Sequence, residues 1–338
     1  MKITKSVNGL LLACAFTPLT AHADLLRINF TLDWSIQGVH AWYYVAQERG
    51  YFEEAGLDVR IDQGEGSAAT VSRIMSGAYD AGFGDMNAII QNAAERPERT
   101  PVMVYQIYNQ PPFALLTKAD GPIQSVEDIE GSTLGAPAGS ASTRLFPVFA
   151  EAAGINLDEV EITNVAPNLQ EQLLNGGDVD GSLVFNVTSY MNLVAQGHDP
   201  ETDYRWFPYG DYGVEVYSNG VMVSRSLIEE QPEAVAGLVS AINRAVQDVI
   251  DEPQLGIEAL LAEEGFLDGE AEAQRLQFAL DNVIISDESK QLGIGAVDEE
   301  RLARSIDTIV ELYELSSTPD VADVYTAEFL PPLDERSL

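Results

Sequence analysis

The stretch TLDWSIQGVHAWYYVAQERGYFEEAGLDVRI, residues 31–61, decides the fold. A short apolar run at 25–30 precedes it and is typical of a buried strand. We expect a helix from about Val39 to Gly50 and a second strand soon after it. Asp33 and Trp34 then lie on the loop that leaves the first strand. In open α/β sheets, ligands bind at this carboxyl edge.

Short apolar runs alternate with segments of helical period along the rest of the chain, which predicts an α/β protein. The length of 338 residues is enough for two domains. A break at 109–112 indicates a first crossing between lobes, and the segment 206–217 indicates the return. We therefore expect one lobe at 24–115 plus 214–338 and a second at 116–213, joined around a cleft that can close.

Residues 1–23 have the features of a secretory signal peptide. They begin with two lysines, continue with an apolar run at 10–16 that is too short to span a bilayer, and end on Ala21-His22-Ala23, a small-x-small cleavage site. This pattern predicts export to the periplasm. The alternative is a lipoprotein site at Cys14, whose lipidation would anchor the protein.

The chain is strongly acidic. It has 54 Asp and Glu residues against 18 Lys and Arg, for a formal net charge of −36. Such a charge argues against binding of nucleic acid or anionic lipid, and it is typical of a salt-adapted proteome. Cys14 is the only cysteine, so no disulfide or cysteine metal site is expected, and no run is long and apolar enough for a transmembrane helix.

The segment 31–61 resembles the periplasmic binding proteins that include the thiamine-pyrimidine-precursor, riboflavin, sulfonate and nitrate receptors of ABC transporters. The resemblance implies a two-lobed, type II-like fold with a ligand cleft between the lobes, and a membrane permease as partner. Asp211-Tyr212-Gly213-Val214 is similar to a segment of the pyrimidine-type branch, although Glu215 stands where that branch has proline. We expect a monomer.

The first lobe offers three groups of candidate ligand-binding residues. Trp34 can stack on a planar ligand, and Asp33 can accept from a ligand amine or cap its own loop. His40, at the helix start, is either a ligand contact or a structural histidine. The other two groups lie at helix starts and comprise Gly66 with Ser67, whose N–H groups attract anions, and Asp85, Met86 and Asn87 at a strand's carboxyl end.

The second lobe offers hydroxyls and free N–H groups at the start of a predicted helix, from Ser140, Ser142 and Thr143. Arg144 follows them and can answer an anion, although exposure to solvent is the simpler interpretation. Phe185 and Asn186, at the end of the last strand of this lobe, are further candidates. On the return segment, Tyr212 is expected to form an aromatic wall opposite Trp34. Glu215 is expected beside the cleft, where its carboxylate can pair with a cation.

The leading hypothesis is a receptor for a small planar nitrogen heterocycle, such as a thiamine pyrimidine precursor. A sulfonate, taurine or nitrate-type anion is the alternative ligand class. One branch of the resemblance is catalytic, the fungal pyrimidine synthase, with a pyridoxal-phosphate lysine, a histidine and a cysteine cluster. Here Gly84 and Ala88 stand at the lysine and histidine positions, and the cluster is missing. We therefore expect neither an enzyme nor a cofactor nor a metal.

Overall fold

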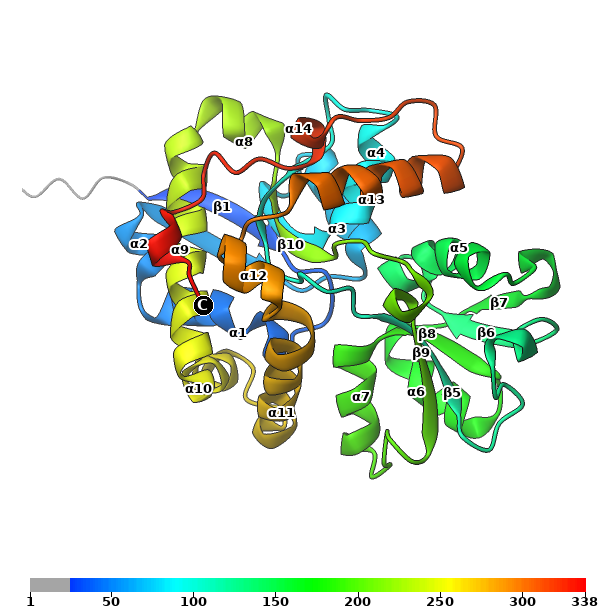
Figure 1. Ribbon diagram of the computed structural model, residues 1–338. Coiled ribbons are helices and arrows are strands. Elements are labelled where there is room, and N and C mark those ends of the chain that lie inside the picture. The colour runs from blue at the N-terminus through cyan, green and yellow to red at the C-terminus, as the bar shows by residue number, and fades with distance from the viewer. Residues whose placement is uncertain (1–24) are drawn as a thin grey trace, which may run out of the picture.

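The computed structural model describes residues 25–338 and shows two lobes joined by two chain crossings (Figure 1). The predicted signal peptide, its cleavage site and the lipidation alternative at Cys14 lie outside the described residues. Each lobe contains a five-stranded mixed sheet covered by helices. The predicted α/β class is therefore confirmed.

The first sheet positions the loops that carry Asp33 and Asp85. Its strands are β1 (Leu26–Thr31), β2 (Leu57–Asp62), β3 (Ala81–Asp85), β4 (Val102–Gln106) and β10 (Asn219–Val223). They lie in the order β2-β1-β3-β10-β4, with β1 parallel to both β2 and β3. Because the carboxyl ends of parallel strands meet at one edge of a sheet, the loops after β1 and β3 share the edge that faces the second lobe.

Helices from both ends of the chain cover this sheet. They are η1 (Gly38–His40), α1 (Ala41–Glu48), α2 (Tyr51–Glu54), α3 (Ser67–Met75), α4 (Met86–Ala93), α8 (Arg225–Glu230), α9 (Pro232–Asp251), α10 (Pro253–Glu263), α11 (Gly269–Ala279), the π-helical η6 (Leu280–Ile284), α12 (Asp287–Leu292), α13 (Glu299–Leu312), α14 (Val321–Val324) and η7 (Leu333–Glu335). Helix α1 packs against α9 and α10 as well as on the sheet, so its residues 41–46 are all buried.

Two large rings anchor α1. Trp42 and Tyr43 are fully buried, and the Tyr43 ring centroid lies 4.9 Å from that of Phe30 on β1. Burial of such a ring removes about 150–250 Å² from water, which corresponds to roughly 4–6 kcal/mol at most. The packing of α1 on β1 therefore holds the loop between them in place.

The second sheet contains β5 (Phe113–Lys118), β6 (Thr133–Ala136), β7 (Glu161–Asn164), β8 (Gly181–Phe185) and β9 (Tyr204–Pro208), in the order β7-β6-β8-β5-β9. Its helices are η2 (Val126–Asp128), α5 (Ala141–Ala153), η3 (Leu157–Glu159), η4 (Pro167–Leu169), α6 (Gln170–Gly176), α7 (Asn186–Ala195) and η5 (Tyr209–Tyr212).

Two details of this lobe differ from the sequence expectation. Strand β5 pairs with β8 and β9, so the first crossing is at 107–112, slightly before the expected division after residue 115. The segment expected to return at Trp206 instead begins with β9, and the return follows at 213–218. Strand β9 was not predicted because it has only five residues and ends in Pro208, so its sequence shows no clear alternation of apolar and polar residues.

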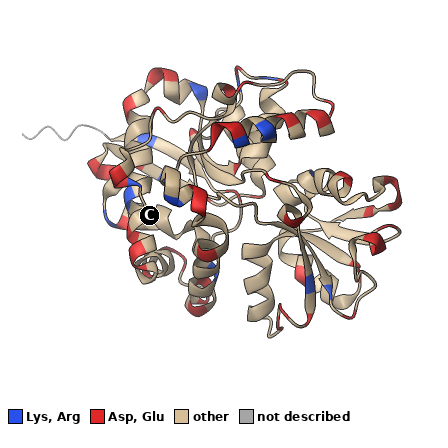
Figure 2. Cartoon of the chain, viewed as in Figure 1, with Lys and Arg blue, Asp and Glu red and all other residues tan. Residues whose placement is uncertain are grey.

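Figure 2 shows Asp and Glu residues distributed along the helices, strands and loops of both lobes, with few Lys and Arg residues between them. No helix in the described part of the chain is long and apolar enough to cross a membrane. The acidic residues are therefore spread over the described part of the chain and do not form one acidic segment.

Candidate functional site

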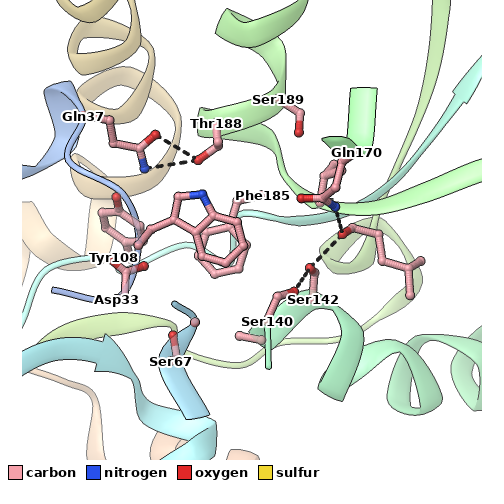
Figure 3. A pocket seen from close by; sticks show the side chains of 15 residues that line it. Asp33, Gln37, Ser67, Tyr108, Ser140, Ser142, Gln170, Phe185, Thr188 and Ser189 are labelled. Atoms are coloured by element: carbon pink, nitrogen blue, oxygen red, sulfur yellow. Dashed lines mark hydrogen bonds between the residues drawn. The ribbon is translucent and has the colours of Figure 1, made fainter. Parts of the chain in front are cut away.

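A cavity lies between the lobes, and the space between its walls, including the part open to solvent, is about 450 Å³. Figure 3 shows that side chains from both lobes point into it, mostly from loops that follow strands and from the first turns of α3, α5, α6 and α7. The residues that line it are Asp33, Trp34, Gln37, Gly66, Ser67, Tyr108, Ser140, Ala141, Ser142, Gln170, Leu183, Val184, Phe185, Thr188 and Ser189.

Asp33 is the only acidic or basic side chain among the described residues that line the cavity. Its Oδ2 accepts a hydrogen bond from Asn219 Nδ2 at 2.7 Å, and its Oδ1 lies 3.0 Å from His40 Nε2. The backbone N–H of Gln37 donates to His40 Nδ1 at 3.3 Å, which leaves the imidazole proton on Nε2, facing Asp33. Two donors thus fix the carboxylate from behind, and its remaining lone pairs are available to a ligand.

Aromatic side chains from both lobes form flat walls. Trp34 follows Asp33 and is half-buried, and Tyr108 on the first crossing is buried with its ring edge-on to Phe83 at 5.3 Å. Phe185, at the end of β8, packs edge-to-face on Phe113 at a centroid distance of 5.3 Å. The Tyr108 and Phe185 rings are each held by an aromatic neighbour, and all three rings offer flat faces or edges to a planar ligand.

Hydroxyl and amide groups form the side of the cavity at the start of α5. The Ser140 hydroxyl caps the helix by accepting from the Thr143 backbone N–H at 3.3 Å, and it lies 2.7 Å from Ser142 Oγ. Ser142 Oγ and Gln170 Nε2 both donate to the Leu183 carbonyl, at 3.1 and 2.9 Å. These groups offer donors and acceptors together, which suits the edge of a heterocycle.

The floor of the cavity is a backbone contact between the lobes. Gly66 caps α3 with a φ of 113°, a conformation that strongly favours glycine, and its N–H donates to the Asp33 carbonyl at 2.6 Å. A Cβ on Gly66 would lie 2.6 Å from the carbonyl oxygen of Gly139 in the second lobe. Ser67 follows Gly66 and lines the same floor.

Four predicted residues of the first lobe lie behind the cavity instead of lining it. His40 is fully buried and acts on Asp33. Asp85, Met86 and Asn87 are buried at the start of α4, where Asn87 Nδ2 donates to Asp85 Oδ1 and to the Tyr217 carbonyl. Burial raises the pKa of Asp85 to about 7. These polar groups bind one another, so the structure does not bring them to a ligand in the cavity.

Four predicted residues of the second lobe and its return segment also do not line the cavity. Thr143 donates to the Pro137 carbonyl, and the Asn186 side chain accepts from the next backbone N–H. Tyr212 packs edge-to-face on Phe149, so Phe185 supplies the wall that was expected from Tyr212. Glu215 is exposed and lies outside the lining.

The basic residue proposed as an anion partner is also engaged elsewhere. The Arg144 guanidinium donates to the side-chain oxygen of Gln91 on α4. It therefore ties α5 to the first lobe and does not line the cavity.

The sequence model of the family described as NMT1/THI5 like matches residues 37–255, more than half of the chain. The chain belongs to this family. The match includes η1, α1 and the second lobe, so it covers the segments that supply most of the cavity. The resemblance seen in residues 31–61 is confirmed at this level.

Relatives in the family have more than one kind of name. The formylaminopyrimidine-binding protein of Halalkalibacterium halodurans is 27% identical over 265 residues, which cover 77% of this chain and 78% of that protein. Riboflavin-binding protein RibY of Chloroflexus aurantiacus is 24% identical over 92% of this chain and 88% of its own length. The 4-amino-5-hydroxymethyl-2-methylpyrimidine phosphate synthase of Schizosaccharomyces pombe is 22% identical over 67% and 66%. Binding proteins and a named enzyme thus share this family.

A solved structure confirms the predicted fold. The periplasmic aliphatic sulphonate binding protein SsuA from Escherichia coli has a TM-score of 0.68 to this chain, at 18% identity, over 89% of this chain and 96% of that chain. At this identity the likeness shows the two-lobed binding-protein architecture and leaves the ligand open.

The sequence did not single out seven of the lining residues. Two are apolar, Leu183 and Val184, and the others are Gln37, Tyr108, Gln170, Thr188 and Ser189. Tyr108 had a detectable signal, since it ends a buried run at a lobe crossing. Thr188 and Ser189 also lie in the first turn after a strand, where ligand contacts concentrate. Gln37 lies between the candidates Trp34 and His40, and Gln170 begins α6. Only the arrangement of the two lobes shows that both side chains line the cavity.

Proposed function

We propose that this protein is the extracytoplasmic receptor of an ABC importer, and that it binds a small planar nitrogen heterocycle of the thiamine-pyrimidine-precursor type between its lobes. The observation that carries the proposal is the chemistry of the cavity. Aromatic side chains from both lobes enclose one oriented carboxylate, and no Lys, Arg or His lines the cavity among the described residues.

A heterocycle bearing an amino group matches each part of this lining. The rings of Trp34 and Phe185 can cover its faces, and Asp33 can accept from the amino group in a charge-assisted hydrogen bond. Gln170 donates only one of its two amide protons to the Leu183 carbonyl, so the other can donate to a ring nitrogen on the opposite edge. The formylaminopyrimidine-binding relative supports this ligand class.

An anionic ligand is the second candidate, because the start of α5 offers N–H groups and SsuA shares the fold. A sulfonate in this cavity would lie beside the Asp33 carboxylate with no cationic side chain to compensate. Burial of an unpaired charge is costly, and a second charge of the same sign adds to that cost. The lining therefore favours a neutral or cationic ring.

A receptor role is also favoured over catalysis. The described lining contains no lysine, histidine or cysteine. It therefore lacks the lysine, histidine and cysteine cluster that the resemblance implies for the catalytic fungal branch. The two lobes and their crossings suit a cycle in which the ligand promotes closure and a permease recognises the closed form. We further propose that the protein acts in the periplasm as a monomer.

Isothermal titration calorimetry of the chain from Asp24, at high salt, tests the ligand class. The titrants are 4-amino-5-hydroxymethyl-2-methylpyrimidine, its formylamino analogue, riboflavin and an aliphatic sulfonate. We expect saturable binding of a pyrimidine with one ligand per chain, accompanied by about 2.7 kcal/mol of added stability at a hundred times Kd. Binding of the sulfonate alone would contradict the heterocycle proposal and retain the receptor class.

A further inference from the structure

Helix α11 of the first lobe lies directly against α7 of the second lobe, beside the cavity (Figure 1). One side chain makes most of the polar contacts across this boundary. Arg275 on α11 is 4% exposed, and its guanidinium donates to the Val187 carbonyl at 3.1 Å, the Thr188 carbonyl at 2.7 Å and Asn192 Oδ1 at 3.1 Å. All three acceptors belong to α7.

Glu272, one turn earlier on α11, connects the same arginine to the first-lobe wall of the cavity. It pairs with Arg275 at 2.9 Å, and its Oε2 also accepts from the backbone N–H of Gly38. A Cβ on Gly38 would lie 2.3 Å from the Glu272 carbonyl oxygen, so the loop lies directly on the helix. The buried ion pair thus holds a backbone group of the Asp33–His40 loop on one side and α7 on the other.

The two segments held in this way also meet over the cavity. The Gln37 side chain and Thr188 Oγ1 are hydrogen-bonded across the lobes at 3.2 Å, as Figure 3 shows, and both residues line the cavity. On the outer side of the same boundary, the Tyr190 ring of α7 stacks on Phe278 of α11 at 4.9 Å. Neither Glu272 nor Arg275 lines the cavity.

We propose that Glu272 and Arg275 form a closure clamp: they position Gln37 and Thr188 over the cavity and thereby slow the release of ligand without touching it. The inference rests on the proposed function only in that a ligand occupies the cleft. Opening of the lobes must separate α7 from α11, so the Arg275 contacts to α7 are lost and only those within α11 remain. The clamp is therefore specific to the closed arrangement.

Arg275→Lys isolates the contacts between lobes. Removal of the positive charge altogether would leave Glu272 buried and unpaired, which can unfold α11. Lysine retains a charge for Glu272, but its compact ammonium cannot reach three acceptors in the fixed fork that guanidinium provides. Arg244→Lys is the matched control, because Arg244 pairs with Glu54 inside the first lobe and stacks over the Tyr51 ring.

Two readouts test the clamp. Spin labels on Glu161→Cys and Glu233→Cys, one exposed site in each lobe of the chain from Asp24, report the distance between lobes. Stopped-flow dissociation of 4-amino-5-hydroxymethyl-2-methylpyrimidine reports ligand release. We expect Arg275→Lys to broaden the distances toward more open arrangements and to speed release about tenfold or more, while Arg244→Lys changes neither.

An unchanged distance distribution and release rate in Arg275→Lys would overturn the clamp. The distance measurement does not need the ligand to be identified. If the pyrimidine fails to bind the parent protein, the proposed ligand is refuted, while the distances with and without Arg275 still decide whether the ion pair closes the lobes.

Discussion

Replacement of Asp33 by asparagine tests the ligand chemistry most directly. The carboxylate accepts from His40 at 3.0 Å and from Asn219 at 2.7 Å, and both partners are donors in this geometry. Asparagine has one carbonyl oxygen, so one of these donors would face its NH2 group. His40 cannot relieve the conflict by changing tautomer, because its Nδ1 accepts from the Gln37 backbone N–H.

The expected magnitudes follow from this geometry. One unsatisfied buried donor costs about 1–3 kcal/mol of folding stability. Loss of a charge-assisted hydrogen bond to the ligand amine costs about 1.5–3 kcal/mol of binding, which is roughly a 10- to 150-fold increase in Kd. Asp33→Asn should therefore lower both the melting temperature and the affinity.

A paired ligand separates the two effects. Titration calorimetry is done with 4-amino-5-hydroxymethyl-2-methylpyrimidine and with the analogue that lacks the 4-amino group. In the parent protein the analogue should bind roughly 10- to 150-fold more weakly, and in Asp33→Asn the two ligands should bind almost equally. Asp80→Asn is the control. Asp80 accepts from the Asn29 backbone N–H at the start of β3, away from the carboxyl edge that carries the cavity, so this variant should change stability and leave affinity unchanged.

An equal loss of affinity for both ligands in Asp33→Asn would refute the reasoning. It would show that the carboxylate supports the shape of the pocket through His40 and Asn219 and makes no contact with a ligand amine.

Three other outcomes are expected. Trp34→Ala should weaken pyrimidine binding by more than the roughly 1.5 kcal/mol of a stacking pair, because it also opens the cavity; calorimetry measures this, and an unchanged Kd would remove Trp34 from the site. Because burial raises the pKa of Asp85 from 3.8 to about 7, the folded state holds that proton more tightly, so Asp85 costs stability increasingly as pH rises between these values. Asp85→Asn should remove this slope in denaturant titrations and stabilise the protein at pH 8 by at most about 4 kcal/mol. With a net charge of −36, the unfolding midpoint should rise from low to high KCl, and a midpoint independent of salt would contradict self-repulsion.

Periodicity and turn signals in the sequence predicted the layered α/β architecture, because most strands are short apolar runs followed by a capped or glycine-started helix. Strand β9 escaped because its residues alternate only briefly, and its place beside β5 depends on pairing between distant segments. The division between the lobes was displaced for a related reason. Phe113, Ala114 and Leu115 are apolar in either sheet, and only their partners on β8 assign them to the second.

The candidate site divides by the same physics. Asp33, Trp34, Gly66, Ser67, Ser140 and Ser142 lie where strand ends and helix starts place them, and the structure brings them together. Asp85 and Asn87 occupy an equivalent strand end, yet they turn inward, where Asn87 Nδ2 donates to Asp85 Oδ1 and to the Tyr217 carbonyl. Which of two equivalent loops faces a cleft depends on how β10 crosses between β3 and β4, and no local pattern encodes that crossing.

The meeting of Gly66 with Gly139 restricts how this receptor can diversify. Where two backbones touch, there is no side chain to exchange, and a single added methyl group would wedge the lobes apart. Homologues that keep this contact can enlarge or shrink their pocket through side chains of the other walls, such as Trp34, Phe185 and Thr188. The range of ligands open to evolution, or to an engineer of biosensors, therefore depends on the side chains of these walls and not on the floor.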